Sequence, residues 1–198
     1  LWGIIAYLSR NGRRRDTGQA LLGFATLMQG MELMSGSVAG LAQAEGFRRL
    51  FTAFTDPLLG LLAGAVLTAV IQSSSASVGI LQALAASGQV TVGAAVPIIM
   101  GQNIGTCVTA LISSIGVNRS ARRVAIIHIS FNCIGTLILL PLLYLVNAFA
   151  DFVFMEWTIS YAGIAVVHTI FNVAVTFMLL PFSKLLEKLA YFVIKRVP

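Results

Sequence analysis

The sequence QSSSAS, residues 72–77, interrupts an apolar run that extends over residues 58–86. Five of its six side chains are polar, and they stand where the flanking residues predict hydrocarbon surroundings. Inside a membrane an unsatisfied polar group is costly, so such a cluster persists only where it lines a cavity, binds a solute or contacts protein. This hydroxyl-rich stretch is therefore the first candidate for a functional site.

The composition predicts an integral membrane protein. Of the 198 residues, 58% are hydrophobic and only 10% are charged, which is too apolar for a water-soluble domain of this size. The net charge of +6 does not indicate a nucleic-acid partner, because the basic residues stand in short groups between apolar segments. Such groups are typical of the loops and flanks of membrane helices, at residues 10–15, 48–49, 119–123 and 184–196.

The lengths of the apolar segments predict how the chain meets the bilayer. About 20 residues cross its core, so residues 19–38 are predicted to form the first complete span. Residues 57–88 are too short for two spans and break at the serine cluster, which predicts a re-entrant helical hairpin that starts at Asp56-Pro57. Residues 90–115 contain a second polar stretch flanked by glycines, GQNIGT at 101–106, and are predicted to form a discontinuous helix.

The remaining segments complete an all-α membrane fold, a helical bundle with one hairpin and one broken helix. Further spans are predicted at residues 121–148 and 157–181, and residues 1–18 are predicted to be the end of a preceding membrane helix followed by a basic cytoplasmic loop. Residues 182–198 are predicted to form an amphipathic basic helix on the membrane surface. The basic loops indicate a multi-pass protein of the cell (plasma or inner) membrane with a cytoplasmic C-terminus.

A pattern repeats near the end of the chain. His128-Ile-Ser-Phe-Asn132 and His168-Thr-Ile-Phe-Asn172 both read His-x-x-Phe-Asn, 40 positions apart, and each is followed by a proline at the same offset. The spacing i, i+3, i+4 puts the three side chains on one helix face, so each helix presents a polar notch. Two interpretations stay open, namely hydrogen bonding between helices and direct contact with a transported species.

The two polar stretches predict a binding site for an anion together with a small cation. Helix N-termini offer N–H groups, helix C-termini offer carbonyl oxygens, and a hydroxyl can serve both ions. The predicted spans contain lysine or arginine only at the start of the span 121–148, as Arg122 and Arg123. A phosphate-like anion deeper in the membrane therefore needs neutral donors and co-bound cations. The predicted substrate and ion ligands are Gln72, Ser73, Ser74, Ser75, Gln102, Asn103 and Thr106, and all of these except Gln102 are predicted to hold sodium.

Secondary candidates lie near these residues or stand alone within a predicted span. From the residues alone the serine cluster can equally be a packing device, and Glu32, the one acidic residue within a predicted span, can equally lie at a helix end. No cofactor is expected beyond sodium as the coupling ion. The secondary candidates are Ser77, Thr109, Glu32, His128, Asn132, His168 and Asn172.

The motifs and their order resemble one family of transporters. Residues 68–76, then 101–106 with Thr109-Ala110, then the paired His-x-x-Phe-Asn segments, are similar to the bacterial form of the type II sodium-dependent phosphate cotransporter (Na/Pi cotransporter) family, over residues 23–182. The resemblance implies an inverted-repeat transporter of which residues 19–181 form the second repeat half. It implies that Gln72, Ser73, Ser74 and Ser75 are substrate and sodium determinants, with Asn103 and Thr106 in the adjoining break.

The resemblance also implies partners and a function. The partners are inorganic phosphate, sodium, the lipid bilayer, a first repeat half from the parent chain or another copy, and a regulatory domain beyond Pro198. The predicted function is sodium-coupled symport of inorganic phosphate, without enzymatic activity. One alternative is an antiparallel homodimeric channel or exporter, which the consistent charge bias disfavours. The other is an intramembrane serine hydrolase, disfavoured because no Gly-x-Ser-x-Gly motif and no suitably spaced carboxylate are present.

Overall fold

Every regular element of the described chain is a helix. The computed structural model describes residues 1–39, 56–86, 88 and 90–195, and within them only an isolated bridge between Thr91 and Thr158 departs from helices, turns and loops. The elements are α1 (Trp2–Tyr7), α2 (Gly12–Ala39), α4 (Pro57–Ile71), α5 (Ser74–Ala86), α6 (Val92–Ser113), α7 (Arg119–Ala150), the 3₁₀ turn η2 (Val153–Glu156), α8 (Tyr161–Leu179), the 3₁₀ turn η3 (Leu180–Phe182) and α9 (Ser183–Val193).

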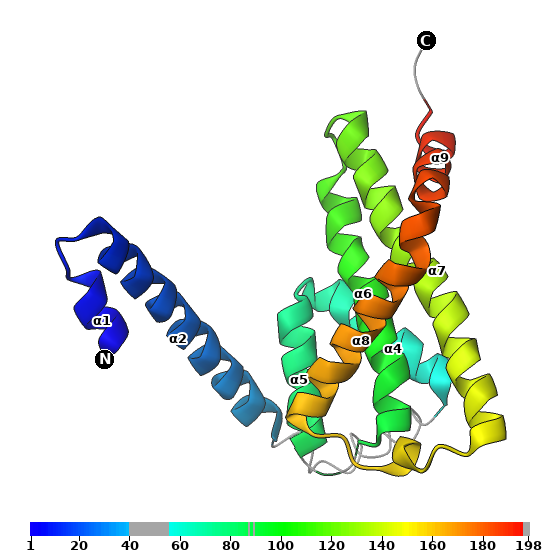
Figure 1. Ribbon diagram of the computed structural model, residues 1–198, viewed down its shortest axis with the longest axis horizontal. Helices are drawn as coiled ribbons and strands as arrows, with labels where there is room; N and C mark the ends of the chain where they lie inside the picture. Colours follow the sequence, from blue (N-terminus) through cyan, green and yellow to red (C-terminus); the bar gives the residue numbers. More distant parts are fainter. Residues whose placement is uncertain (40–55, 87, 89, 196–198) are drawn as a thin grey trace.

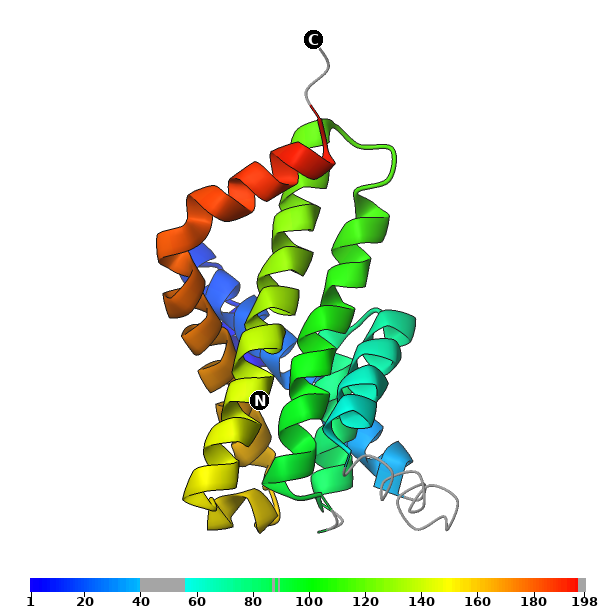
Figure 2. The same ribbon diagram turned by 90° about the vertical axis from the view of Figure 1, so that its right-hand side faces the viewer.

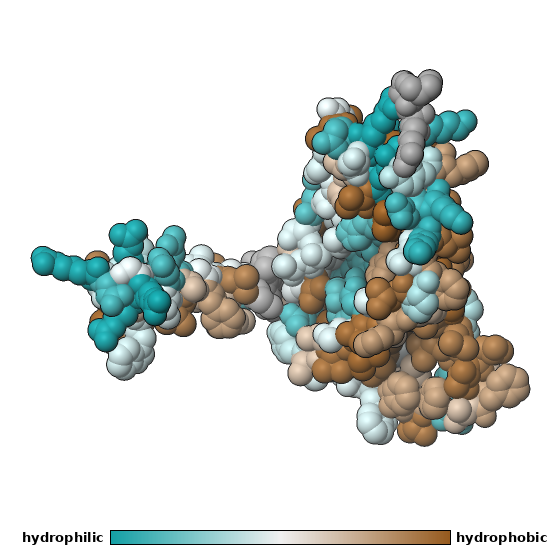
Figure 3. Space-filling model, turned by 45° about the horizontal axis from the view of Figure 1, so that its top comes forward, coloured by the Kyte–Doolittle hydropathy of each residue, from teal (hydrophilic) through white to brown (hydrophobic). Residues whose placement is uncertain are grey.

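Three of the described helical segments are long and apolar enough to cross a membrane. They are Val92–Ser113, Arg119–Ala150 and Tyr161–Val193, the last of which joins α8, η3 and α9. Apolar side chains gather over the lower part of the bundle, whereas hydrophilic ones gather at its upper end and at the far end of α1 and α2 (Figure 3). The protein is thus an all-α membrane protein, as its composition predicts.

Helices α4 and α5 form a hairpin. Asp56 caps α4, because its Oδ1 accepts hydrogen bonds from the backbone N–H groups of Leu58 and Leu59 at 2.8 and 3.1 Å, and Pro57 occupies the first turn. The predicted helix start is therefore confirmed. With 15 residues, α4 is about 22 Å long, less than the roughly 30 Å of a bilayer core. Figure 2 shows the tip of the hairpin beside the middle of α6.

The prediction of a discontinuous helix at 90–115 is wrong. Helix α6 runs unbroken from Val92 to Ser113, through Pro97 and through the whole GQNIGT stretch. The glycines serve packing instead of a break. A Cβ atom at Gly101 would collide with the carbonyl oxygen of Leu61, and one at Gly105 would collide with that of Ala65. Small residues that let two backbones approach closely are the usual means of packing membrane helices.

Helices α4 and α6 consequently lie side by side and run in the same direction. Gly64 on α4 faces the carbonyl of Ile98, so glycines on both helices make the contact. The buried apolar residues form two clusters around α6. One joins it to α5 and the start of α8, and the other joins it to α7, α8 and α9. Helix α6 is thus the central element against which the others pack.

The N-terminal region differs from the prediction. Helix α2 begins at Gly12, so Arg13 to Arg15 lie in its first turn and not in a loop, and α2 is not among the helices long and apolar enough to span a membrane. Figure 1 shows α1 and α2 extending away from the bundle, with the end of α2 approaching α5. A Cβ atom at Gly18 of α2 would meet the backbone of Tyr7, which shows how closely α1 packs on α2.

Helices α7 and α8 are the long helices that carry the repeated pattern, and α9 follows them. Asn118 caps α7, because its Oδ1 accepts a hydrogen bond from the N–H of Ala121 at 2.9 Å. Ser160 caps α8, because its hydroxyl oxygen accepts one from the N–H of Gly163 at 3.1 Å. The predicted span at 157–181 therefore begins as a helix only at Tyr161. Helix α9 lies along α7 with Leu186 and Ala190 buried, within the segment predicted to be amphipathic.

Candidate functional site

The serine cluster forms the tip of the hairpin and the first turn of α5. Gln72 ends α4 in the left-handed conformation, with a φ of 56°, and α5 starts two residues later at Ser74. The hydroxyl of Ser73 accepts a hydrogen bond from the N–H of Ala76 at 3.3 Å and so caps α5. The carboxyl end of α4, with its free carbonyl oxygens, and the amino end of α5, with its free N–H groups, thus meet at one point.

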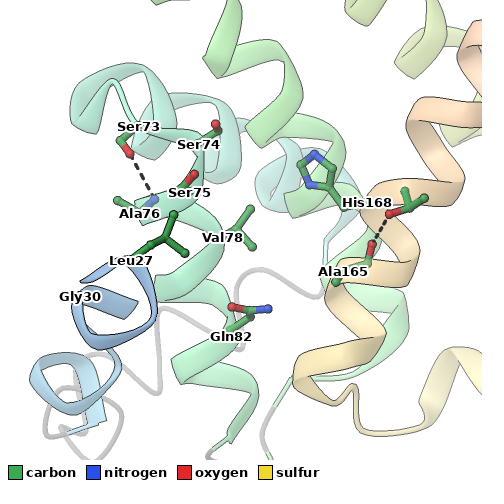
Figure 4. A pocket seen from close by; sticks show the side chains of 11 residues that line it. Leu27, Gly30, Ser73, Ser74, Ser75, Ala76, Val78, Gln82, Ala165 and His168 are labelled. Atoms are coloured by element: carbon green, nitrogen blue, oxygen red, sulfur yellow. Dashed lines mark hydrogen bonds between the residues drawn. The ribbon is translucent and has the colours of Figure 1, made fainter. Parts of the chain in front are cut away.

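This tip lines a pocket of about 670 Å³ between α5, α8 and α2. Figure 4 shows Ser73, Ser74 and Ser75 on one side, with Leu27 and Gly30 of α2 beside them, and His168 of α8 opposite. The remaining lining residues are Ala76, Val78, Gln82, Ala165 and Thr169. The cluster is therefore neither sealed by apolar neighbours nor placed on an open loop.

Polar side chains without formal charge stand in a largely apolar pocket wall. None of the described residues that line the pocket is a lysine, an arginine or a carboxylate. The hydroxyl groups of Ser74 and Ser75 make no hydrogen bond within the described part of the chain, so both can serve a ligand. Because the N-terminus of α5 adds a partial positive charge beside them, the site suits an anion held by neutral donors.

Ser77 and Gln102 belong to a buried network below the pocket. Thr68 of α4 donates to the Ser77 hydroxyl at 2.7 Å, and the Gln102 side-chain amide donates to the Ser77 hydroxyl and carbonyl oxygens at 3.0 Å each. All three residues are buried. This network ties both arms of the hairpin to α6, so the packing interpretation of the serine cluster applies to Ser77. The Oε1 atom of Gln102 has no partner among the described residues.

The other candidate residues on α6 donate their side-chain hydrogen bonds locally, to carbonyls of their own helix. Asn103 donates to the carbonyl of Ile99 at 2.8 Å, Thr106 donates to that of Gln102 at 2.8 Å, and Thr109 donates to that of Thr106 at 2.7 Å. None of these side chains lines the pocket. Glu32 is exposed on α2 and Gln72 is exposed at the tip, and neither lines the pocket.

The two His-x-x-Phe-Asn segments contact the same face of α6. Asn132 of α7 donates to Cys107 Sγ at 3.3 Å, and Asn172 of α8 donates to Asn103 Oδ1 at 3.2 Å. The asparagines therefore follow the interpretation of hydrogen bonding between helices. The histidines differ, because His168 lines the pocket and His128 does not.

Several pocket residues escaped the sequence analysis. Gln82 follows Ser75 by seven positions, which is two helical turns, so its place on the same face of α5 could have been deduced from the period. Its Nε2 donates to the carbonyl of Tyr161 at 3.3 Å and links α5 to α8. Leu27, Gly30 and Ala165 carry no polar side chain, so no local signal marks them.

Comparisons with known proteins agree with these features. The chain is 32% identical over 145 residues to YjbB of Escherichia coli (strain K12), which is named as a putative inorganic phosphate export protein. The matched stretch covers 72% of this chain and 27% of YjbB. It is 29% identical over 152 residues to the uncharacterised protein YqeW of Bacillus subtilis (strain 168), and the matched stretch covers 75% of this chain and 49% of YqeW. It is 38% identical over 121 residues to the human sodium-dependent phosphate transport protein 2B, and the matched stretch covers 58% of this chain and 17% of the human protein.

This chain thus spans less than half the length of these relatives. No solved structure matches it. The family model described as Na+/Pi-cotransporter matches residues 27–180, which is most of the chain and includes the hairpin, α6, α7 and α8. The chain therefore belongs to the Na+/Pi-cotransporter family.

Proposed function

We propose that the protein containing this chain moves inorganic phosphate across the cell membrane together with sodium ions, and that the pocket at the hairpin tip is its half of the binding site. One observation carries the proposal. The hydroxyl groups of Ser74 and Ser75 line a pocket at a helix N-terminus and make no hydrogen bond within the described residues. Free donors of this kind are expected where an oxyanion binds.

The charge of the pocket favours coupling to a cation. Phosphate carries one to two negative charges near neutral pH, and no lysine or arginine is among the described residues that line the pocket to balance them. The dipole of α5 supplies only about half an elementary charge. Sodium ions bound at the carboxyl end of α4 and at the serine hydroxyls would supply the remainder, through the hard oxygen ligands that such ions prefer. Uptake of the anion would then require sodium.

A second repeat half would complete the site. Among the described residues the pocket is not fully enclosed, and this chain spans less than half the length of its relatives. In transporters built from repeats, the substrate binds where the halves meet, and their relative movement exposes it to each side in turn. The part of the pocket that is not enclosed is the place where a first half, from the parent chain or a second copy, would contact the substrate.

Export of phosphate is the second candidate, because the Escherichia coli relative bears that name. The two directions differ in their driving force. Sodium flowing into the cell drives uptake, whereas export must run against that gradient or without it. Transport measured in both directions therefore separates them.

The test uses the full-length protein in proteoliposomes. Radioactive phosphate is added outside the vesicles to measure uptake, or enclosed inside them to measure efflux. We expect uptake that needs external sodium and is lost in choline. Ser74→Ala and Ser75→Ala should each lower uptake at least tenfold with unchanged reconstitution, since a hydrogen bond to a charged group contributes about 1.5–3 kcal/mol. The matched control is Ser113→Ala, because Ser113 is exposed at the end of α6 and does not line the pocket. Equal uptake in choline would overturn the sodium coupling, and transport seen only as efflux would assign export.

A further inference from the structure

A second pocket lies at the other end of the bundle, away from the loop that joins α5 to α6. It measures about 470 Å³ and lies between the end of α6, the start of α7 and the end of α9. Its walls are aliphatic, with Ile112, Ile115 and Ile126 among them, and its polar side chains are those of Ser114 and Arg122. Among the described residues it shares no lining residue with the pocket at the hairpin tip.

Arg122 is a free cation in this pocket. Its side chain is exposed, and within the described residues no hydrogen bond or carboxylate engages it. Arg119 stands one turn earlier on the same helix, and residues 114–123 contain no acidic side chain. The N-terminus of α7 adds its own partial positive charge at this point. Arg119 does not line the pocket, so the Arg122 guanidinium and the start of α7 are the two positive contributions at the pocket itself. Among the described lining residues no anion balances them.

The neighbouring Arg123 has a different role. Its Nε and Nη2 atoms donate to the carbonyl oxygen of Ile194 at 3.2 and 3.0 Å, and its guanidinium lies 4.1 Å from the centre of the Tyr191 ring. It thus holds the end of α9 against α7 and shapes one wall of the pocket. The two consecutive arginines therefore differ. Arg123 is held by contacts within the protein, whereas the guanidinium of Arg122 has no partner among the described residues.

The surroundings favour a lipid over a free ion as that ligand. Ile112 and Ile115 are 48% and 78% exposed beside the guanidinium, at the end of a spanning helix, where lipid headgroups and acyl chains meet. Helix α9 carries Leu185, Leu189 and Phe192 exposed alongside Lys184 and Lys188, the pattern of a helix in the interfacial region. A free phosphate would gain nothing from aliphatic walls, whereas a phospholipid uses both the walls and the charge.

We propose that this pocket binds an anionic phospholipid, with its phosphate at Arg122 beside the start of α7 and the start of its acyl chains against the isoleucine wall. Basic pockets between membrane helices are known to take such headgroups. The bound lipid would neutralise the start of α7 and pack the junction of α6, α7 and α9.

The test counts bound lipid directly. The full-length protein is purified in detergent from vesicles of phosphatidylglycerol and phosphatidylcholine, and retained lipid is counted by native mass spectrometry. We expect phosphatidylglycerol to be retained preferentially and Arg122→Gln to lower its retention about fivefold, since one basic side chain near an anionic surface contributes about 1 kcal/mol. Arg119→Gln removes the same charge one turn away, outside the pocket lining, and should change retention less than twofold.

A second variant keeps the charges and removes the space. Ile112→Trp should fill the pocket from its exposed wall and lower retention similarly, and thermal unfolding in detergent checks that each variant is folded. Equal retention in wild type and Arg122→Gln would overturn the proposal, as would equal losses in Arg122→Gln and Arg119→Gln. Displacement of the lipid by millimolar inorganic phosphate would assign the site to free phosphate.

Discussion

The side-chain amide of Asn172 on α8 donates a hydrogen bond to the side-chain oxygen of Asn103 on α6 at 3.2 Å. The equivalent Asn132 on α7 donates to Cys107, one turn further along α6. The two His-x-x-Phe-Asn segments therefore form hydrogen bonds to consecutive turns of α6. Asn172 sits one turn after the pocket residue His168, so this bond joins the wall of the pocket to the centre of the bundle.

The bond between Asn103 and Asn172 should be measurable as a coupling energy. In a double-mutant cycle of Asn103→Ala and Asn172→Ala, we expect a coupling of about 0.6 kcal/mol, the average for hydrogen bonds between membrane helices. Unfolding of the purified protein by denaturing detergent gives the four free energies. The cycle of Asn103→Ala with Asn132→Ala serves as control and should show no coupling, because no bond joins that pair. Equal couplings in the two cycles would contradict the assignment.

Gly101 should tolerate no side chain. Gly101→Ala places a Cβ atom against the carbonyl of Leu61 and should lower the free energy of unfolding by about 3 kcal/mol or more, because backbone cannot move aside as a side chain can. Yield and thermal unfolding measure this. Gly23→Ala is the matched control, since nothing lies within 4 Å of a Cβ there and alanine is the better helix former by about 1 kcal/mol. A stable Gly101→Ala protein would show that α4 and α6 are not in close contact.

Replacing Gln72 separates the shape of the hairpin from its chemistry. Gln72→Gly suits the left-handed conformation, so the free energy of unfolding should stay unchanged or rise by up to about 1 kcal/mol. If its amide serves as a ligand, sodium-driven phosphate uptake should nevertheless fall at least tenfold. Gln72→Asn, which tolerates the same conformation and keeps the amide, should retain more activity. Uptake at the wild-type rate in Gln72→Gly would restrict Gln72 to shaping the turn.

His168 and His128 form a natural pair for testing contact with the substrate. Only His168 lines the pocket at the hairpin tip, although both begin the same motif. His168→Gln should therefore raise the KM for phosphate about tenfold, the effect of weakening one hydrogen bond to a charged group. His128→Gln should leave KM unchanged. Initial rates of uptake over a range of phosphate concentrations measure both, and equal effects would show that the histidines act through the packing of their helices.

The sequence was most informative where a local cause determines the structure. Asp56-Pro57 announces the start of α4, because a capping carboxylate and a proline suit the first helical turn. The glycines at 101 and 105 were misleading, since glycine permits both a helix break and the close approach of two helices. Which of the two occurs depends on whether a partner helix is present. That partner, α4, lies some 40 residues earlier, so no window around 101–106 could reveal it.

The candidate site was predictable in part for the same reason. The serine cluster stands out because hydroxyls are conspicuous in an apolar run, and it does line a pocket. Which serine lines the pocket and which one packs against other helices was not predictable. Ser75 faces the pocket, whereas Ser77, two residues on, is buried against Thr68 and Gln102. At about 100° of rotation per residue, the side chains of Ser75 and Ser77 point about 200° apart around α5. Only the position of α6 decides which of these two faces is buried.

The close contact between α4 and α6 limits how this protein can move. Two helices whose backbones touch through glycines cannot slide past one another without a clash at each turn, so the hairpin and α6 must travel as one rigid block. The joint facing α8 is different, because a hollow lined by small and polar side chains lies there. Any cycle that opens the hollow first to one compartment and then to the other would therefore shift α8 and its neighbours against that block, leaving the serines fixed at its edge.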